Sequence, residues 1–168
     1  MSSDRAQTSA ASVSSELFRQ ACGRFPTGVA IAAIAGSDGA PHGLTVSSFT
    51  SLSLDPPLVL ICLGHAVTLI DHFRTAEHFG LSVLREDQRP ISERFARRGQ
   101  NRFTGVPWHS GEFHVPLING SLAAIECAVD RRIAAGDHDI LIGRVLRAHV
   151  SEGRPLVHWA GKYGRLEE

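Results

Sequence analysis

The segment GLTVSSFTSLSLDPPLVLICL, residues 43–63, decides the fold class. It alternates apolar and hydroxyl-bearing side chains, passes through Asp55-Pro56-Pro57, and ends in an unbroken apolar run. Successive side chains of a strand point to opposite faces, so the alternation predicts a long strand from Gly43 with two unlike faces. The predicted apolar face carries Leu44, Val46, Leu52 and Leu54. The predicted hydroxyl-lined face carries Thr45, Ser47, Phe49, Ser51 and Ser53.

The flanking segments predict further antiparallel strands, about six in all. An apolar strand over 29–35 leads through the turn sequence 36–39 into the hydroxyl-rich strand, and LVLICL, 58–63, is typical of a buried strand. Near the C-terminus, two longer strands flank the turn-forming tetrapeptide 136–139. This pattern favours a mainly β fold, an antiparallel β-barrel, over an alternating α/β sheet.

Peripheral α-helices are predicted between the strands. Ser14 or Ser15 can cap a short helix whose Leu17 and Phe18 form an apolar face, which we expect to pack against the sheet. The apolar spacing over 67–73 predicts a second helix, and a third is predicted over 87–99. The stretch 104–120 is predicted to be a loop rich in glycine, proline and aromatic residues.

Composition narrows the range of partners and locations. Seventeen basic residues balance seventeen acidic ones over 168 residues, which favours one domain with a small-molecule partner and no recruitment of nucleic acid or anionic membrane. Three cysteines without a CxxC pair favour a reducing compartment. Residues 1–14 lack the pattern of a secretory signal and are predicted to be a disordered arm before a domain over 15–168. The predicted location is therefore cytoplasmic.

The hydroxyl-lined face has two interpretations. Hydroxyls and backbone amides are neutral donors that suit a phosphate or a polyol, although neither a Walker nor a Rossmann motif is present. Alternatively, the face meets solvent on an exposed sheet, because Thr is a good strand former. The nine histidines show no metal-ligand spacing, so no metal is predicted.

Three motifs then occur in order along the chain: RFPTGVAIA at 24–32, the segment 43–63, and GDHDILIGRV at 136–145. Together they resemble the short-chain flavin reductases that supply reduced flavin to two-component monooxygenases. The likeness runs from about Phe18 to the C-terminus. It implies an FMN-binding split β-barrel that forms a homodimer and holds FMN or FAD near the subunit interface.

The resemblance also implies a set of flavin-binding residues. Pro26, Thr27 and Gly28 match the segment whose backbone lies against the isoalloxazine edge. The positions matching the strand that meets the ring and ribityl chain are Thr45, Val46, Ser47 and Ser48. Those nearer the ribityl chain and phosphate are Ser51, Ser53 and Cys62. Phe95 and Ala96 match a segment that borders the flavin.

A second implied constellation is Gly136, Asp137 and His138, which from the residues alone is a hairpin turn. In the family, the matching histidine contacts the nicotinamide end of NADH or NADPH. Hydride transfer requires the donor carbon to be held close to the flavin, so His138 is the catalytic candidate in a positioning role. The resemblance also places Tyr163 and Trp159 near the active site, although either ring could equally serve in core packing.

Six arginines crowd the region of the third predicted helix: Arg85, Arg89, Arg94, Arg97, Arg98 and Arg102. Such a run is typical of a solvated helix face with acidic neighbours, and one or two of these side chains could instead bind a nucleotide phosphate. The predicted function is NAD(P)H-dependent reduction of FMN or FAD for a partner monooxygenase. The alternatives are a pyridoxamine-phosphate-oxidase-like FMN oxidase and a non-catalytic flavin or haem carrier.

Overall fold

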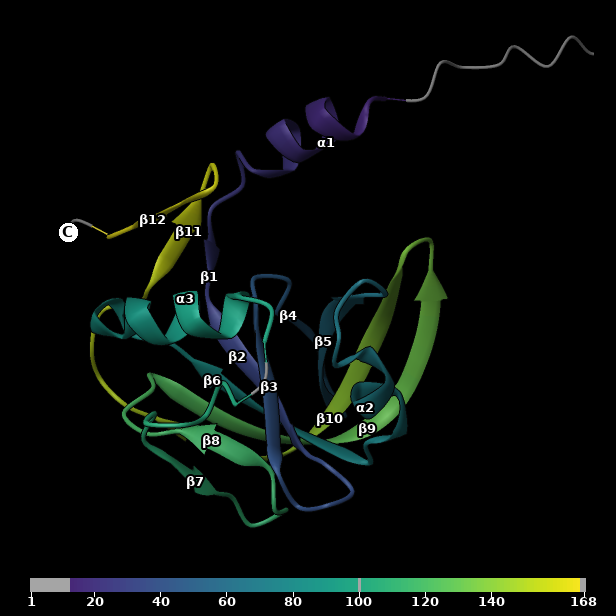
Figure 1. Ribbon diagram of the computed structural model, residues 1–168, viewed down its shortest axis with the longest axis vertical. Coiled ribbons are helices and arrows are strands. Elements are labelled where there is room, and N and C mark those ends of the chain that lie inside the picture. The colour runs from purple at the N-terminus through teal and green to yellow at the C-terminus, as the bar shows by residue number, and fades with distance from the viewer. Residues whose placement is uncertain (1–12, 100, 167–168) are drawn as a thin grey trace, which may run out of the picture.

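The computed structural model describes residues 13–99 and 101–166. The predicted N-terminal arm therefore lies outside the described residues except for Val13 and Ser14. The chain forms one large antiparallel sheet, two small sheets and three short α-helices within the described part (Figure 1).

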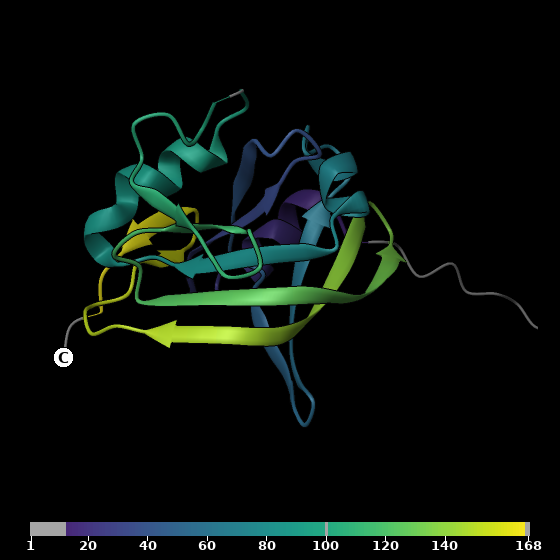
Figure 2. The same ribbon diagram turned by 90° about the horizontal axis from the view of Figure 1, so that it is seen from below.

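The large sheet has seven strands, each antiparallel to its neighbours. Their order across the sheet is β3 (Pro41–Val46), β2 (Ala30–Ala35), β6 (His78–Val83), β9 (Ala123–Ala135), β10 (His138–Val150), β5 (Pro57–Gly64) and β4 (Thr50–Leu54). Figure 2 shows β6, β9 and β10 running side by side across one layer.

The connection between β3 and β4 curls this sheet into a barrel. These two strands form opposite edges of the sheet, yet only residues 47–49 join them. Three linking residues allow at most about 14 Å between Val46 and Thr50, so the two edges must lie close together. The Ser48 hydroxyl attaches the linker to β5, the neighbour of β4, because it accepts the Cys62 N–H at 2.9 Å and donates to the Cys62 carbonyl at 3.2 Å. The predicted split β-barrel is confirmed.

The barrel interior is apolar and continuous. Alternate residues of β5 are buried, as the run LVLICL predicts. Fully buried side chains from several strands meet there, among them Ile61, Phe79, Leu81 and Leu141. Gly143 of β10 lies against this cluster, because a Cβ at that position would come within 2.4 Å of Phe79. The long β9–β10 pair is the predicted C-terminal hairpin.

Two small sheets and the helices lie around the barrel. One sheet joins β1 (Thr27–Gly28), β11 (Val157–Trp159) and β12 (Lys162–Gly164). The other pairs β7 (Trp108–Ser110) with β8 (Pro116–Ile118), within the stretch predicted as a loop. The helices are α1 (Ser15–Cys22), α2 (Ile70–Thr75) and α3 (Arg89–Ala96), with a 3₁₀ turn over Glu86–Gln88. The twelve described strands exceed the expected six because the two small sheets add five short strands with little periodicity, and the strand from Gly43 is divided into β3 and β4.

Helix α3 packs on the outside of the barrel through a second apolar cluster. Phe95 of α3 is buried and meets Phe103 edge-on, with ring centroids 4.8 Å apart. Gly43 of β3 permits this close approach, since a Cβ there would come within 3.0 Å of Phe95 and 3.1 Å of Phe103. The glycine thus lets the helix sit directly against β3.

Helix α1 begins as predicted but does not pack as predicted. The Ser14 hydroxyl accepts the Leu17 N–H and caps the helix. No side chain of α1 is buried, Phe18 is 61 % exposed, and Figure 1 shows the helix projecting from the barrel. The expected packing of its apolar face against the sheet is therefore wrong within this single chain.

The prediction of one long strand from Gly43 is also wrong. The strand breaks at 47–49, so the alternation in β3 does not continue into β4. Leu44 and Val46 are buried in the barrel, whereas Leu52 is 45 % and Leu54 94 % exposed. The reason is that β4 is an edge strand that pairs only with β5, with a register shift between Ser51 and Ser53.

Candidate functional site

Two of the predicted flavin-binding segments lie at the same end of the barrel. In the β2–β3 register, Ala30 pairs with Val46. Gly28 precedes Ala30 by two residues and Ser48 follows Val46 by two, so both lie just beyond this last pair. No atom lies within 4 Å of where a Cβ at Gly28 would be, so the space beside this backbone is open.

Strand β5 connects these segments to the predicted nicotinamide residues. Cys62, which is bonded to Ser48, pairs with Ile140 of β10, and two residues further Gly64 pairs with His138. Gly136, with φ 63°, and Asp137 form the turn before His138. The Asp137 carboxylate lies 2.7 Å from His138 Nδ1 and its pKa is lowered by that hydrogen bond. The turn over Gly136 and Asp137 thus lies at the end of β5, just beyond Cys62 and its bond to Ser48.

A cavity of about 260 Å³ brings three predicted residues together. Thr45 of β3 lines it with Phe95 and Ala96 of α3. The other lining residues are Leu44, Ala66, Val67, Thr68, Arg98 and Arg102. Thr68 lies in the segment between β5 and α2, and no motif in the sequence indicated it.

This cavity adjoins a larger one of about 590 Å³, and both are lined by Thr68 and Arg102. The larger cavity extends along the N-terminal half of β3 to His42 and His72, whose rings stack with centroids 4.3 Å apart. Burial, reinforced by the charge of His72, lowers the pKa of His42. The two cavities form an extended groove between α2, β3 and α3.

Two buried polar atoms in the described part of the chain have no hydrogen-bond partner, namely Thr27 Oγ1 and Arg102 Nε. Arg102 donates from Nη1 to the Gly43 carbonyl at 2.7 Å, and burial lowers the pKa of the Arg102 guanidinium. Buried polar groups are normally satisfied, so these two atoms are candidate contacts for a bound water or ligand. Thr27 is a predicted flavin-binding residue, whereas Arg102 was one of six undistinguished arginines.

Two hydroxyls of the segment 43–63, of which only Thr45 belongs to the predicted hydroxyl-lined face, serve the fold itself. The Thr45 hydroxyl donates to the Ser92 carbonyl of α3 at 2.7 Å, and the Ser48 hydroxyl is bonded to Cys62. Ser47 and Ser51 are exposed and Ser53 is half-buried. The hydroxyls beside the core strand therefore attach β3 to α3 on one side and to β5 on the other.

The structure separates four of the six arginines into two groups. Arg85 pairs with Asp87 at 2.6 Å and Arg89 pairs with Glu93 at 2.7 Å, as expected of a solvated helix face. Arg98 and Arg102 instead line the groove.

Tyr163 lies against α3. Its hydroxyl is 2.8 Å from Ser92 Oγ, and the Arg89 guanidinium lies 5.2 Å from its ring centre. His158 pairs with both Tyr163 and Thr27, so Tyr163 is linked to the segment 26–28 that was predicted to bind flavin. Trp159 is more exposed and donates from Nε1 to the Arg24 carbonyl.

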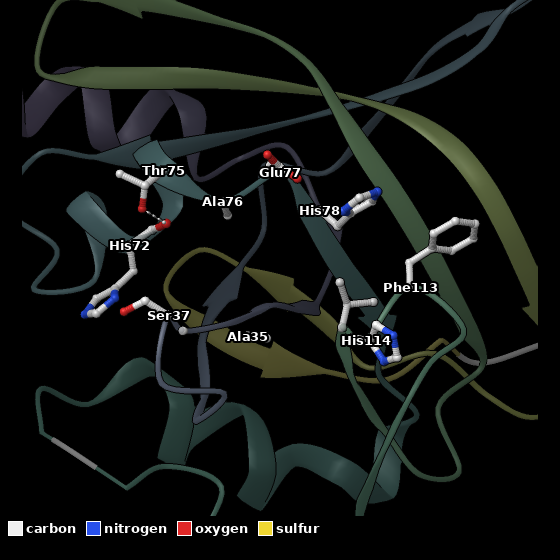
Figure 3. A pocket seen from close by; sticks show the side chains of 11 residues that line it. Ala35, Ser37, His72, Thr75, Ala76, Glu77, His78, Phe113 and His114 are labelled. Carbon is white, nitrogen blue, oxygen red and sulfur yellow. Dashed lines mark hydrogen bonds between the residues drawn. The ribbon is translucent and has the colours of Figure 1, made fainter.

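A further cavity of about 350 Å³ contains none of the predicted site residues. Figure 3 shows its imidazoles, His72, His78 and His114, with Phe113 beside His78 and Glu77 at the rim.

Within 13–99 and 101–166, no group of three or more His, Cys, Asp or Glu side chains is arranged to hold a metal ion. Nor does the described part of the chain include a helix with the length and apolar character needed to span a bilayer.

Comparison with known proteins identifies the family. Residues 22–167 match the family described as the flavin reductase like domain. This match covers most of the chain, so the protein belongs to the flavin-reductase-like family, and the predicted resemblance is confirmed.

Individual relatives agree with this family. The chain is 42 % identical over 152 residues to an FMN reductase (NADH) of Agrobacterium fabrum, covering 90 % of this chain and 86 % of that protein. It is also 38 % identical over 151 residues to an actinorhodin polyketide dimerase of Streptomyces coelicolor, covering 89 % and 85 %. A solved NADH:FAD oxidoreductase of Streptomyces globisporus, in complex with NAD and FAD fragments, superposes with a TM-score of 0.85 at 37 % identity, covering 89 % and 91 %.

Proposed function

We propose that this protein is an NADH-dependent flavin reductase that binds FMN or FAD in the groove between β3, α2 and α3. The predicted function, NAD(P)H-dependent flavin reduction for a partner monooxygenase, agrees with relatives named as NADH-dependent reductases and as reductase components of monooxygenases. One observation supports the location most directly: Arg102, a half-buried residue whose Nε is buried without a partner, lines both cavities of the groove.

The residues present suit a flavin nucleotide. The bound flavin would supply the hydride-accepting ring. The open space beside Gly28 leaves room for the edge of the flavin ring, and Thr27 offers a hydroxyl that has no hydrogen-bond partner. Arg98 and Arg102 are the cations positioned to bind a phosphate. The hydroxyls of Thr45 and Ser48 are already hydrogen-bonded within the protein, so backbone groups are left to contact the flavin ring. A site with few charged donors favours modest affinity, which release of reduced flavin requires.

His138 is the proposed contact for the nicotinamide. Its half-exposed imidazole stands at the end of the β9–β10 hairpin, beside Asp137 and above Gly64. NADH is the proposed donor because the relatives whose names specify a nicotinamide name NADH.

Homodimerisation is proposed as well. Large apolar side chains remain exposed on the described chain, including Phe18 and Phe25 near the N-terminus, Leu54 at the β4–β5 turn, and Val150 at the end of β10. A second copy would cover such surfaces. Light scattering on the purified protein tests this state, and a monomer mass would refute it.

A cytoplasmic location is proposed because the three cysteines are free.

The function is tested by mixing the protein with NADH and either FMN or FAD and following nicotinamide loss. We expect oxidation with at least one flavin. Absence of turnover with both flavins would refute the reductase, and flavin binding without turnover would indicate a carrier instead.

The location is tested by flavin titration with Arg102→Gln. We expect the flavin Kd to rise about tenfold or more, as loss of a charge-assisted hydrogen bond implies. Arg154→Gln is the matched control, because Arg154 is exposed and lines neither cavity. An unchanged Kd in Arg102→Gln would place the flavin elsewhere.

A further inference from the structure

We propose that His65 is a positioning residue for hydride transfer, because it clamps the turn that carries His138. His65 is the first residue after β5. Its backbone N–H donates to the Asp137 carbonyl at 2.9 Å, and its Nε2 lies 2.8 Å from Asp139 Oδ1. One residue therefore contacts the positions immediately before and after His138. This inference rests on the proposed role of His138.

Asp139 provides the anchor for this clamp. It is one of the few buried charged residues of the described chain, and its second oxygen accepts the Arg74 Nε–H at 2.8 Å. The hydrogen bonds from Arg74 and then from His65 lower the pKa of Asp139, so it remains a carboxylate at neutral pH. Arg74 belongs to α2, and the clamp thus joins the hairpin turn to that helix.

The clamp matters because the turn has little other support. Residues 131–138 are all exposed, and Gly136 adopts a left-handed conformation at the turn. The His138 ring rests above Gly64, where a Cβ would come within 3.3 Å of Nε2, and its Nδ1 is bonded to Asp137. Any displacement of Asp137 therefore moves the imidazole. A shift of about 1 Å in a positioning group can cost up to a hundredfold in rate.

The test compares His65→Phe with His65→Gln in steady-state kinetics, with flavin saturating and NADH varied. We expect His65→Phe to lower kcat/KM for NADH about tenfold while the flavin Kd is unchanged. His65→Gln retains a side-chain donor for Asp139 and should recover most of that loss. His109→Phe is the control, since His109 is an exposed residue of β7 whose imidazole is bonded to the Asn119 side chain.

A double-mutant cycle with His138→Ala separates positioning from plain stability. If His65 acts through His138, His65→Phe should change kcat/KM by less than about twofold once His138 is absent. Equal loss in both backgrounds would overturn the clamp and leave the reductase function intact. If His138→Ala itself leaves NADH use unchanged, the proposed role of His138 fails, and the clamp fails with it.

Discussion

Replacing Ser48 with alanine tests how the barrel is closed. In the β4–β5 ladder Thr50 pairs with Leu60, and the same register extended by two residues brings Ser48 opposite Cys62. There the Ser48 hydroxyl takes the place of a backbone partner by bonding both the N–H and the carbonyl of Cys62. Ser48→Ala removes both bonds and leaves two backbone groups of β5 without partners.

The expected cost follows from those two bonds. Each hydrogen bond contributes about 0.5–1.5 kcal/mol net, so the free energy of unfolding should fall by about 1–3 kcal/mol. The lower half is expected, because Ser48 and Cys62 are only half-buried and water can reach the freed groups. For a chain of this size a loss of about 1–2 kcal/mol lowers the melting temperature by about 2–8 °C.

Urea unfolding without added flavin measures this loss, with Ser47→Ala as the control. Ser47 is exposed and adjacent, so its replacement should change stability by less than about 0.5 kcal/mol. If Ser48→Ala unfolds at the same midpoint as Ser47→Ala, the hydroxyl bridge does not close the barrel.

Three further outcomes are expected. Gly143→Ala should destabilise the fold by about 1–3 kcal/mol in urea unfolding, because its Cβ would meet Phe79 at 2.4 Å; parent-like stability would contradict this packing. Asp139→Asn should be less stable than the parent above about pH 4, and the difference should shrink as the pH falls, because a carboxylate with a lowered pKa loses its stabilising charge on protonation. A gap that stayed constant down to pH 2 would refute that linkage. Burial and the neighbouring Glu126 raise the pKa of Cys127 to about 12, so a thiol reagent at pH 8 should modify exposed Cys22 and leave Cys127 intact; modification of Cys127 in the folded protein would be the contrary result.

The barrel could be predicted from the sequence because its signals are local. The turn sequences at 36–39 and 136–139 and the apolar run 58–63 each specify a strand or hairpin without reference to the rest of the chain. The break at 47–49 could not, since hydroxyl-bearing residues continue through it from one strand into the next. Only the position of β3 and β4 at opposite edges of the sheet requires the chain to cross there.

The candidate site shows the same division between local and distant signals. Thr45, Phe95 and Ala96 were predicted through the family motifs, and they line one cavity. Arg102 gave no separate signal, because what distinguishes it from the paired Arg85 and Arg89 is a buried Nε that has no hydrogen-bond partner. Burial of an arginine depends on how α3 and the segment after it pack on β3, which no window of sequence reports.

His65, Arg74 and Asp139 mark where sequence reasoning ends. They come from a loop, a helix and a strand, at separations that match no motif spacing, and they meet because β5 pairs with β10. The pairing of Gly64 with His138 brings His65 beside the turn and gives Asp139 access to both α2 and the β5 end. In the proposed mechanism, His138, which contacts the nicotinamide, thus depends on His65, which the β5–β10 pairing places beside the turn. The double-mutant cycle tests this dependence, because loss of the His65 side chain should lower kcat/KM only while His138 is present.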